Sequence, residues 1–266
     1  MVFTVIGTGN MGQALVSGFL RSKVLKADEI RLCDTDQEKL AIYAKSNGCH
    51  AFSSAKEAVQ GADYVLLAVK PQVLNQTVTS FLPSLSENTV IISIAAGVKI
   101  ARLRGLINPG NPLVRVMPNT PALVGAAVNA VCFDNVDEKS TEFVTRLLKT
   151  CGMVVPCDEK TLDAIGCVSG TGPAYVMLFI ESLADAAVKL GIPRQTALEI
   201  AAMTVYGSGK LAVETQTHPA ILKDQVCSPG GTTIEGVLAL EKFGLRAAVE
   251  AAVIAADDKT RVLAGG

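Results

Sequence analysis

Two segments of this sequence, one near each end, carry residue types that can hold an anion. The one near the C-terminus is Ser228-Pro229-Gly230-Gly231-Thr232-Thr233, directly before a new apolar run. Proline and paired glycines make a poor helix interior, but backbone N–H groups and hydroxyls at the start of a helix bind carboxylates and phosphates. The segment therefore predicts an anion site. An ordinary turn between two helices, capped by serine or threonine, explains the same residues.

The segment near the N-terminus is Gly7-Thr8-Gly9-Asn10-Met11-Gly12, which lies between a predicted buried strand at 2–6 and a run with helical spacing. A strand, Gly-x-Gly-x-x-Gly and a helix in this order form the dinucleotide-binding fingerprint. Asp34 ends the next predicted strand about 20 residues further on, where the fingerprint places a carboxylate that accepts from a ribose hydroxyl. The alternative is a glycine-rich turn that binds no ligand.

Three further loops follow predicted strands and should meet the glycine turn, because ligands of a doubly wound sheet bind at the carboxyl ends of its strands. They are Ala68-Val69-Lys70-Pro71-Gln72, Ser93-Ile94-Ala95-Ala96-Gly97 and Met117-Pro118-Asn119-Thr120-Pro121. The small residues of the second loop would let a flat ring lie against the backbone. We expect Lys70 to pack against a coenzyme rather than to transfer a proton. Turn chemistry alone explains each loop equally well.

Groups that usually transfer protons are scarce, which constrains the chemistry. The chain has two histidines, of which we expect His50 at the surface and His218 at a helix start. An alcohol dehydrogenase needs a base for the hydroxyl proton, whereas a protonated C=N bond is already electrophilic and needs little more than a hydride. A threonine hydroxyl or water can act as the hydrogen-bond donor or acceptor at the nitrogen. We interpret Cys227 as a small buried hydrophobe rather than a catalytic thiol.

Composition narrows the class of protein. With 266 residues, 49% of them hydrophobic, and a formal net charge of −1, the chain can build a large core and is poorly suited to nucleic acid or an anionic membrane surface. We find no uncharged apolar run with the flanks of a membrane span. No signal peptide precedes the first strand. The 7 cysteines, without a C-x-x-C pair, predict a reduced, cytoplasmic protein with no metal site and no disulfide framework.

The order of elements predicts two domains. Up to residue 157, strand-like and helix-like segments alternate, which indicates a Rossmann-type α/β domain with a doubly wound, mainly parallel sheet. The predicted strands are 2–6, 30–34, 63–69, 89–94, 113–117, 126–133 and 153–156. Residues 158–266 form an all-α domain, with long helices at 173–190 and 193–215. Because these two helices are apolar around most of their circumference, we expect them to pack against a second copy of the chain. A compact monomeric bundle is the alternative.

Together these residues closely resemble the pyrroline-5-carboxylate reductase family, from the first strand to the last helix. The likeness rests on Gly7-Thr8-Gly9-Asn10-Met11, Ala68-Val69-Lys70-Pro71, Ala95-Ala96-Gly97, Met117-Pro118-Asn119-Thr120-Pro121, Ser169-Gly170-Thr171-Gly172-Pro173-Ala174-Tyr175 and Ser228-Pro229-Gly230-Gly231-Thr232-Thr233-Ile234. The resemblance implies NAD(P)H-dependent reduction of the cyclic imine 1-pyrroline-5-carboxylate to L-proline, the last step of proline biosynthesis. It also implies a dimer with interlocked helical domains, in some members built up to a decamer. The active site would lie between one subunit's Rossmann domain and the other subunit's helices.

The resemblance also implies roles for individual residues. Thr233 would hydrogen-bond the ring nitrogen and is the predicted catalytic residue. The predicted substrate-binding residues are Val226, Ser228, Gly230, Gly231, Thr232 and Thr233. The predicted coenzyme-binding residues are Ile6, Gly7, Thr8, Gly9, Asn10, Met11, Asp34, Ala68, Val69, Lys70, Pro71, Ala95, Ala96, Gly97, Met117, Pro118 and Asn119.

Coenzyme choice and two other functions stay open. The family commonly uses NADPH, so the resemblance implies NADPH, with NADH possible, but Asp34 would repel a 2′-phosphate and accept from a 2′-hydroxyl. Ala55 stands where the family usually has an asparagine near the ribose phosphate. One alternative is a β-hydroxyacid dehydrogenase of the same two-domain plan, which would carry a lysine early in the first long helix. This chain has none there before Lys189. The other alternative is a non-catalytic dinucleotide-sensing protein.

Overall fold

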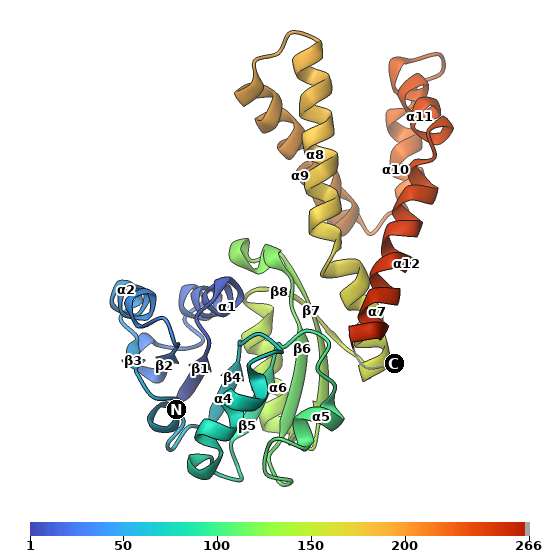
Figure 1. Ribbon diagram of the computed structural model, residues 1–266. Helices are drawn as coiled ribbons and strands as arrows, with labels where there is room; N and C mark the ends of the chain where they lie inside the picture. Colours follow the sequence, from blue (N-terminus) through green and yellow to red (C-terminus); the bar gives the residue numbers. More distant parts are fainter. Residues whose placement is uncertain (264–266) are drawn as a thin grey trace. The chain divides into compact units, whose positions relative to one another are not determined.

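The computed structural model describes residues 1–263, and its N-terminal part is built on an eight-stranded sheet (Figure 1). The strand order is β3-β2-β1-β4-β5-β6-β7-β8, and every neighbouring pair is parallel except β6 with β7. The strands are β1 (Phe3–Ile6), β2 (Ile30–Cys33), β3 (His50–Phe52), β4 (Tyr64–Leu67), β5 (Val90–Ser93), β6 (Leu113–Met117), β7 (Ala127–Asp134) and β8 (Gly152–Pro156).

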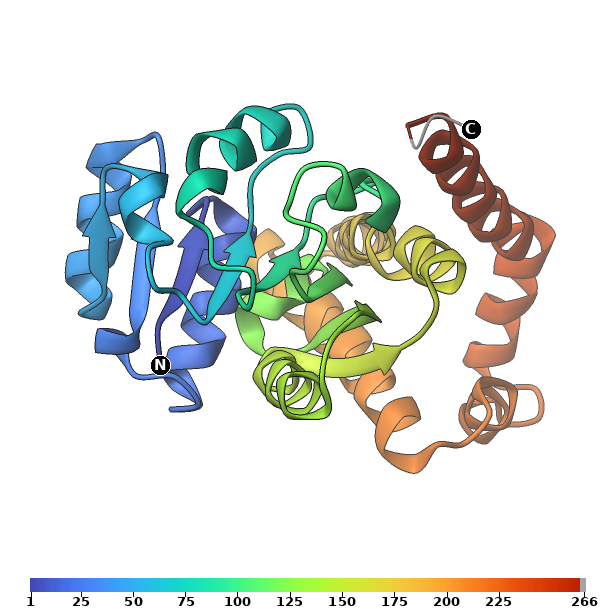
Figure 2. The ribbon, with the colours of Figure 1, turned by 90° about the horizontal axis from the view of Figure 1, so that it is seen from below.

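Helices cover both faces of this sheet, which confirms the predicted doubly wound, mainly parallel fold. One face is covered by α1 (Asn10–Arg21), α2 (Gln37–Asn47) and α6 (Glu138–Lys149). The other is covered by α3 (Ala55–Ala58), α4 (Leu74–Phe81), α5 (Ile100–Arg104) and α7 (Glu159–Ser169). Figure 2 shows α4 and α5 on the side of the sheet opposite α6. The central strands β1, β4 and β5 are fully buried, as continuous apolar runs require, whereas the edge strands β3 and β8 are partly exposed.

The sequence did not predict β3 or α7. The three residues of β3 form the edge of the sheet, and only their pairing with β2 makes them a strand, so no hydrophobic period marks them. His50, the first residue of this strand, is exposed, as predicted. The N-cap of α7 is Asp158, whose side chain accepts a hydrogen bond of 2.7 Å from the backbone N–H of Thr161.

Contacts divide the described chain at Gly170, whereas the sequence predicted a boundary at residue 157. The first unit is Met1–Gly170 together with residues from Asp257 onward, and the second unit is Thr171–Ala256. The difference at the first boundary is α7, which packs on β6 and β7 and therefore belongs with the sheet.

The second unit is entirely helical, as predicted. Its helices are α8 (Gly172–Lys189), α9 (Arg194–Thr215), α10 (Pro219–Val226), α11 (Thr232–Lys242) and the first part of α12 (Leu245–Leu263). Between α8 and α9 the buried residues are three alanines, Ala184, Ala197 and Ala201. Large apolar side chains stay exposed on the same helices, including Met177, Leu178, Ile200, Met203, Tyr206 and Val213. This unit therefore does not bury its own apolar surface.

By length and composition alone, one helical run of the described chain, Glu159–Lys189, could cross a membrane. Its most apolar window is only 11% buried within this single chain. This is weak evidence for a membrane, because a helix that is buried between two subunits has the same composition.

Candidate coenzyme and substrate sites

The sheet changes direction of winding at β1, which has β2 on one side and β4 on the other. The loops after β1 and β4 therefore meet where open α/β sheets bind ligands. Gly7 has a φ of +100°, and a Cβ placed there would lie 2.5 Å from the carbonyl oxygen of Ala68. A Cβ on Gly12 would collide with the carbonyl of Gly7. These two glycines are required by the turn itself.

Gly9 differs from them, because a Cβ there would meet nothing within 4 Å. It faces open space at the start of α1, and it is the N-cap residue of that helix. No side chain caps this helix, and its first turn carries no acidic residue. Backbone N–H groups at such an uncapped N-terminus fit a pyrophosphate, so the residues present suit a dinucleotide.

Asp34 lies directly after β2 and faces the same turn. Its Oδ2 accepts hydrogen bonds from the backbone N–H of Thr8 at 2.5 Å and from the Thr8 hydroxyl at 3.0 Å, and its Oδ1 accepts from the backbone N–H of Asp36 at 3.0 Å. Burial alone would raise the pKa of Asp34, but hydrogen bonds from Asp36, Thr8 and Thr35 outweigh it and lower that pKa. The residue is therefore a fixed anion at neutral pH.

A cavity of about 660 Å³ lies beside Asp34. Its lining includes Gly7, Ser53, Ser54, Ala55 and Lys56, so a cation and several hydroxyls line the same space as the Asp34 carboxylate. Burial, followed by the charge of Asp34, raises the pKa of the neighbouring Cys33 to about 11, which keeps this thiol protonated and unreactive. Position and chemistry suit the ribose and adenine end of a dinucleotide.

The other predicted coenzyme loops also follow carboxyl ends of parallel strands. Lys70 and Ala96 are exposed, whereas Ala95 is buried. Gly97 has a φ of +71°, a backbone conformation that favours glycine. The other residues that are predicted to bind the coenzyme differ in exposure. Ile6, Thr8 and Pro118 are buried, Met11, Val69 and Pro71 are half-buried, and Asn10 is exposed.

Two predicted coenzyme-binding residues use their side chains inside the fold. Asn119 donates to the carbonyl of Ser169 at 2.8 Å and accepts from the backbone N–H of Val128 at 2.9 Å. The side chain of Met117 lies against α7, 3.1 Å from where a Cβ on Gly166 would be. Any contact that Asn119 makes with a coenzyme is therefore expected from its backbone.

The predicted substrate segment connects α10 to α11 in the second unit. Helix α11 begins at Thr232, with Gly231 as its N-cap, and no side chain caps it. The backbone N–H of Gly231 donates to the carbonyl of Ser228 at 3.0 Å, and Gly230 has a φ of +66°. Thr233 is half-buried in the first turn, while Val226, Ser228, Gly230 and Thr232 are exposed. The segment thus forms an open helix N-terminus with hydroxyls around it, which suits a carboxylate.

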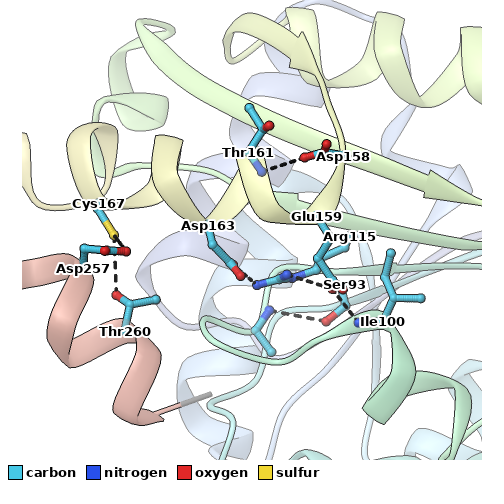
Figure 3. Close-up of polar contacts among 11 residues, drawn as sticks. Ser93, Ile100, Arg115, Asp158, Glu159, Thr161, Asp163, Cys167, Asp257 and Thr260 are labelled. Atoms are coloured by element: carbon cyan, nitrogen blue, oxygen red, sulfur yellow. Dashed lines mark hydrogen bonds and ion pairs between the residues drawn. The ribbon is translucent and has the colours of Figure 1, made fainter. Parts of the chain in front are cut away.

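Sequence reasoning missed a buried charge cluster in the first unit (Figure 3). Arg115 on β6 is 2% exposed, and its guanidinium pairs with Glu159 at 2.8 Å and with Asp163 at 2.6 Å, both on α7. A signal was available, because an arginine inside an otherwise apolar strand needs a carboxylate partner. Within residues 1–263, no group of three or more His, Cys, Asp or Glu side chains is placed to hold a metal ion.

Comparison with known families gives separate matches for the N-terminal and the C-terminal parts of the chain. Residues 159–263 match the family described as "Pyrroline-5-carboxylate reductase dimerisation". Residues 2–97 match the family described as "NADP oxidoreductase coenzyme F420-dependent". The first match covers the helices whose apolar side chains are exposed, and the second covers the glycine turn and Asp34.

Individual relatives are similar over nearly the whole chain. A pyrroline-5-carboxylate reductase of Arabidopsis thaliana is 40% identical over 97% of this chain and 94% of its own length. That of Escherichia coli K12 is 39% identical over 97% of this chain and 96% of its own length. The crystal structure of the Plasmodium falciparum pyrroline carboxylate reductase with NADP bound has a TM-score of 0.89 at 32% identity, and covers 99% of this chain and 98% of that one.

Proposed function

The chain belongs to the pyrroline-5-carboxylate reductase family of NAD(P)H-dependent oxidoreductases, and from this we propose which of its residues carry out the reduction of 1-pyrroline-5-carboxylate to L-proline. The single observation that supports the proposal most is the pair of helix N-termini, at α1 and at α11, that have a glycine as N-cap and no side-chain cap. Reduction of an anionic cyclic imine by a dinucleotide needs one anion site for the pyrophosphate and one for the substrate carboxylate. The N-terminus of α1 suits the first of these sites, and the N-terminus of α11 suits the second.

The coenzyme supplies a hydride when bound, and the first unit holds it. The backbone around Gly9 takes the pyrophosphate, and Asp34 faces the adenosine ribose. The loops at 68–71, 95–97 and 117–119 contact the remainder, through backbone atoms at Asn119. Because Asp34 is anionic and Lys56 is the one cation among the described residues that line the cavity, we propose that the chain accepts both coenzymes and favours NADH over NADPH.

The substrate carboxylate lies on the N–H groups and hydroxyls of residues 228–233, and the Thr233 hydroxyl hydrogen-bonds the ring nitrogen. This hydroxyl orients the C=N bond and stabilises the nitrogen as it becomes an amine. No histidine is needed, because the electrophile is activated by its own protonation. Val226 precedes the segment at the end of α10 and contributes an apolar contact.

Self-association follows from the dimerisation match and from the exposed apolar faces of α8 and α9. We propose a dimer as the basic unit, with a decamer as a possible higher assembly to be resolved by light scattering. All 7 cysteines lie in the described part and are free, which suits the reducing cytoplasm that we propose as its location.

The experiment that tests this function is a steady-state assay at a wavelength of about 340 nm, where reduced nicotinamide absorbs, with 1-pyrroline-5-carboxylate and each coenzyme in turn. We expect oxidation of the coenzyme with stoichiometric formation of proline. Activity with a 3-hydroxy acid instead would support a β-hydroxyacid dehydrogenase, although α8 has no lysine before its last residue, Lys189. Coenzyme binding without turnover of either substrate would indicate a sensor.

A further inference from the structure

The buried Arg115 cluster is connected to the turn that follows β5. Oε1 of Glu159 accepts the ion-pair contact from Arg115 and, at 2.6 Å, a hydrogen bond from the backbone N–H of Ile100 (Figure 3). Ile100 is the first residue of α5, and the turn between β5 and α5 contains Ala95, Ala96 and Gly97. One carboxylate on α7 therefore holds the far end of this turn.

The near end of the same turn is held next to the same arginine. Ser93, the last residue of β5, is the register partner of Arg115 on β6. Its hydroxyl accepts a hydrogen bond of 3.4 Å from the backbone N–H of Ala95. The turn also closes on itself, because the backbone N–H of Val98 donates to the carbonyl of Ala95 at 3.3 Å. Both ends are thus fixed in a region that is centred on a buried guanidinium.

We propose that Glu159 is a positioning residue for the coenzyme: it fixes the 95–97 turn in the conformation that receives the nicotinamide half. The inference rests on the proposed function, in which this turn contacts the coenzyme. A turn that is held rigidly before binding loses less conformational freedom when the coenzyme binds, which increases affinity. Glu159 touches neither coenzyme nor substrate in this account and acts only through the Ile100 N–H.

The cluster offers a matched control in Asp163. This carboxylate pairs with the other terminal nitrogen of Arg115, and its exposure resembles that of Glu159, with side chains 25% and 28% exposed. Unlike Glu159, it has no recorded hydrogen bond to α5 among the described residues. Removing either acid leaves Arg115 with one counter-ion, so both variants should fold with a similar loss of stability.

The test compares Glu159→Ala, Glu159→Gln and Asp163→Ala in the full-length protein, with NADH and NADPH as probes. Coenzyme Kd is measured by the fluorescence of the bound reduced nicotinamide, KM for each substrate by steady-state kinetics, and Tm by thermal unfolding. We expect Glu159→Ala to raise coenzyme Kd by about 10-fold, the size of one lost charge-assisted hydrogen bond, without a matching rise in the KM for the imine. Glu159→Gln should recover most of this loss, because its amide oxygen can still accept from Ile100.

Asp163→Ala should lower Tm as much as Glu159→Ala but change coenzyme Kd by less than about 2-fold. Equal effects of the two acids on coenzyme Kd, or an unchanged Kd in Glu159→Ala, would overturn the proposal. Failure of the proposed function has a different signature: wild-type protein would bind coenzyme but leave 1-pyrroline-5-carboxylate unreduced, and the binding comparison would still decide the role of Glu159. Wild-type protein that binds neither coenzyme would overturn both.

Discussion

Asp34 holds Thr8: one carboxylate oxygen accepts both the backbone N–H and the hydroxyl of that residue, at 2.5 and 3.0 Å. The acid directly after β2 therefore orders the glycine turn after β1 as well as facing the cavity that we assign to the ribose. Variants at Asp34 must therefore be chosen so that the effect of its charge is distinguished from the effect of its hydrogen bonds to Thr8.

Asp34→Asn should improve NADPH use relative to NADH by about 10-fold, or 1–2 kcal/mol, because it removes the charge that repels a 2′-phosphate and keeps an oxygen for Thr8. Asp34→Ser should shift the ratio in the same direction but weaken both coenzymes, since a serine reaches Thr8 less well. The measurement is kcat/KM for each coenzyme. An unchanged ratio in both variants would show that the carboxylate points away from the bound ribose.

The preference for NADH should weaken as pH falls. The pKa of Asp34 is lowered, so the carboxylate stays ionised and does not itself cause a change at mildly acidic pH. The 2′-phosphate of NADPH is a monoester that takes up its second proton at about pH 6. This uptake halves its charge, and therefore halves the repulsion between the phosphate and the Asp34 carboxylate. In the wild type, kcat/KM for NADPH divided by kcat/KM for NADH should therefore increase as the pH is lowered from about 8 to about 5.5. In Asp34→Asn this ratio should not change with pH. The same slope in both proteins would exclude Asp34 as its origin.

Thr233→Ala should lower kcat by about 10- to 100-fold, the loss of one well-placed hydrogen bond to the ring nitrogen. Coenzyme Kd should barely change, because the first unit binds the coenzyme. Thr233→Ser keeps the hydroxyl and should retain much of the activity. A wild-type kcat in a correctly folded alanine variant would indicate that water, not Thr233, is the proton source for the ring nitrogen.

Gly231→Ala should raise the KM for the imine by about 10-fold and leave coenzyme KM unchanged. A Cβ on Gly231 would collide with the hydroxyl of Ser228 and lie 3.1 Å from its carbonyl oxygen, so Ser228 must move away from the carboxylate site. Steady-state kinetics with each substrate varied separately will show this. Equal increases in both KM values would point to general disruption of the fold.

Met203→Glu should weaken self-association, because the apolar side chain of Met203 is 65% exposed on α9 in the single chain. Ile42→Glu is the matched control: Ile42 is 61% exposed, but it lies on α2, outside the dimerisation match. Light scattering at micromolar concentration should show a dimer or larger for the wild type and the control. The dimer dissociation constant of Met203→Glu should rise by at least about 10-fold.

The features that the sequence determined by itself are those encoded in contiguous residues. The run from β1 through Gly7 and Gly12 into α1 specifies a strand, a tight turn and a helix, each by local backbone preference. The Ser228-Pro229-Gly230-Gly231 segment ends one helix and begins another for the same reason. The apolar circumference of α8 and α9 similarly indicated a partner, because an apolar surface on every side of a helix needs a cover on every side.

The tertiary structure alone decided which distant residues act together. β3 is a strand only because it pairs with β2. The side chain of Asn119 is used inside the fold because it hydrogen-bonds to backbone atoms of Ser169 and Val128. Glu159 joins Arg115 to the turn before α5 across 44 and 59 residues of sequence. Hydrophobic periodicity reports which face of an element is buried, but not which element covers it. A polar contact between two elements therefore becomes visible only when strand order and helix placement are known.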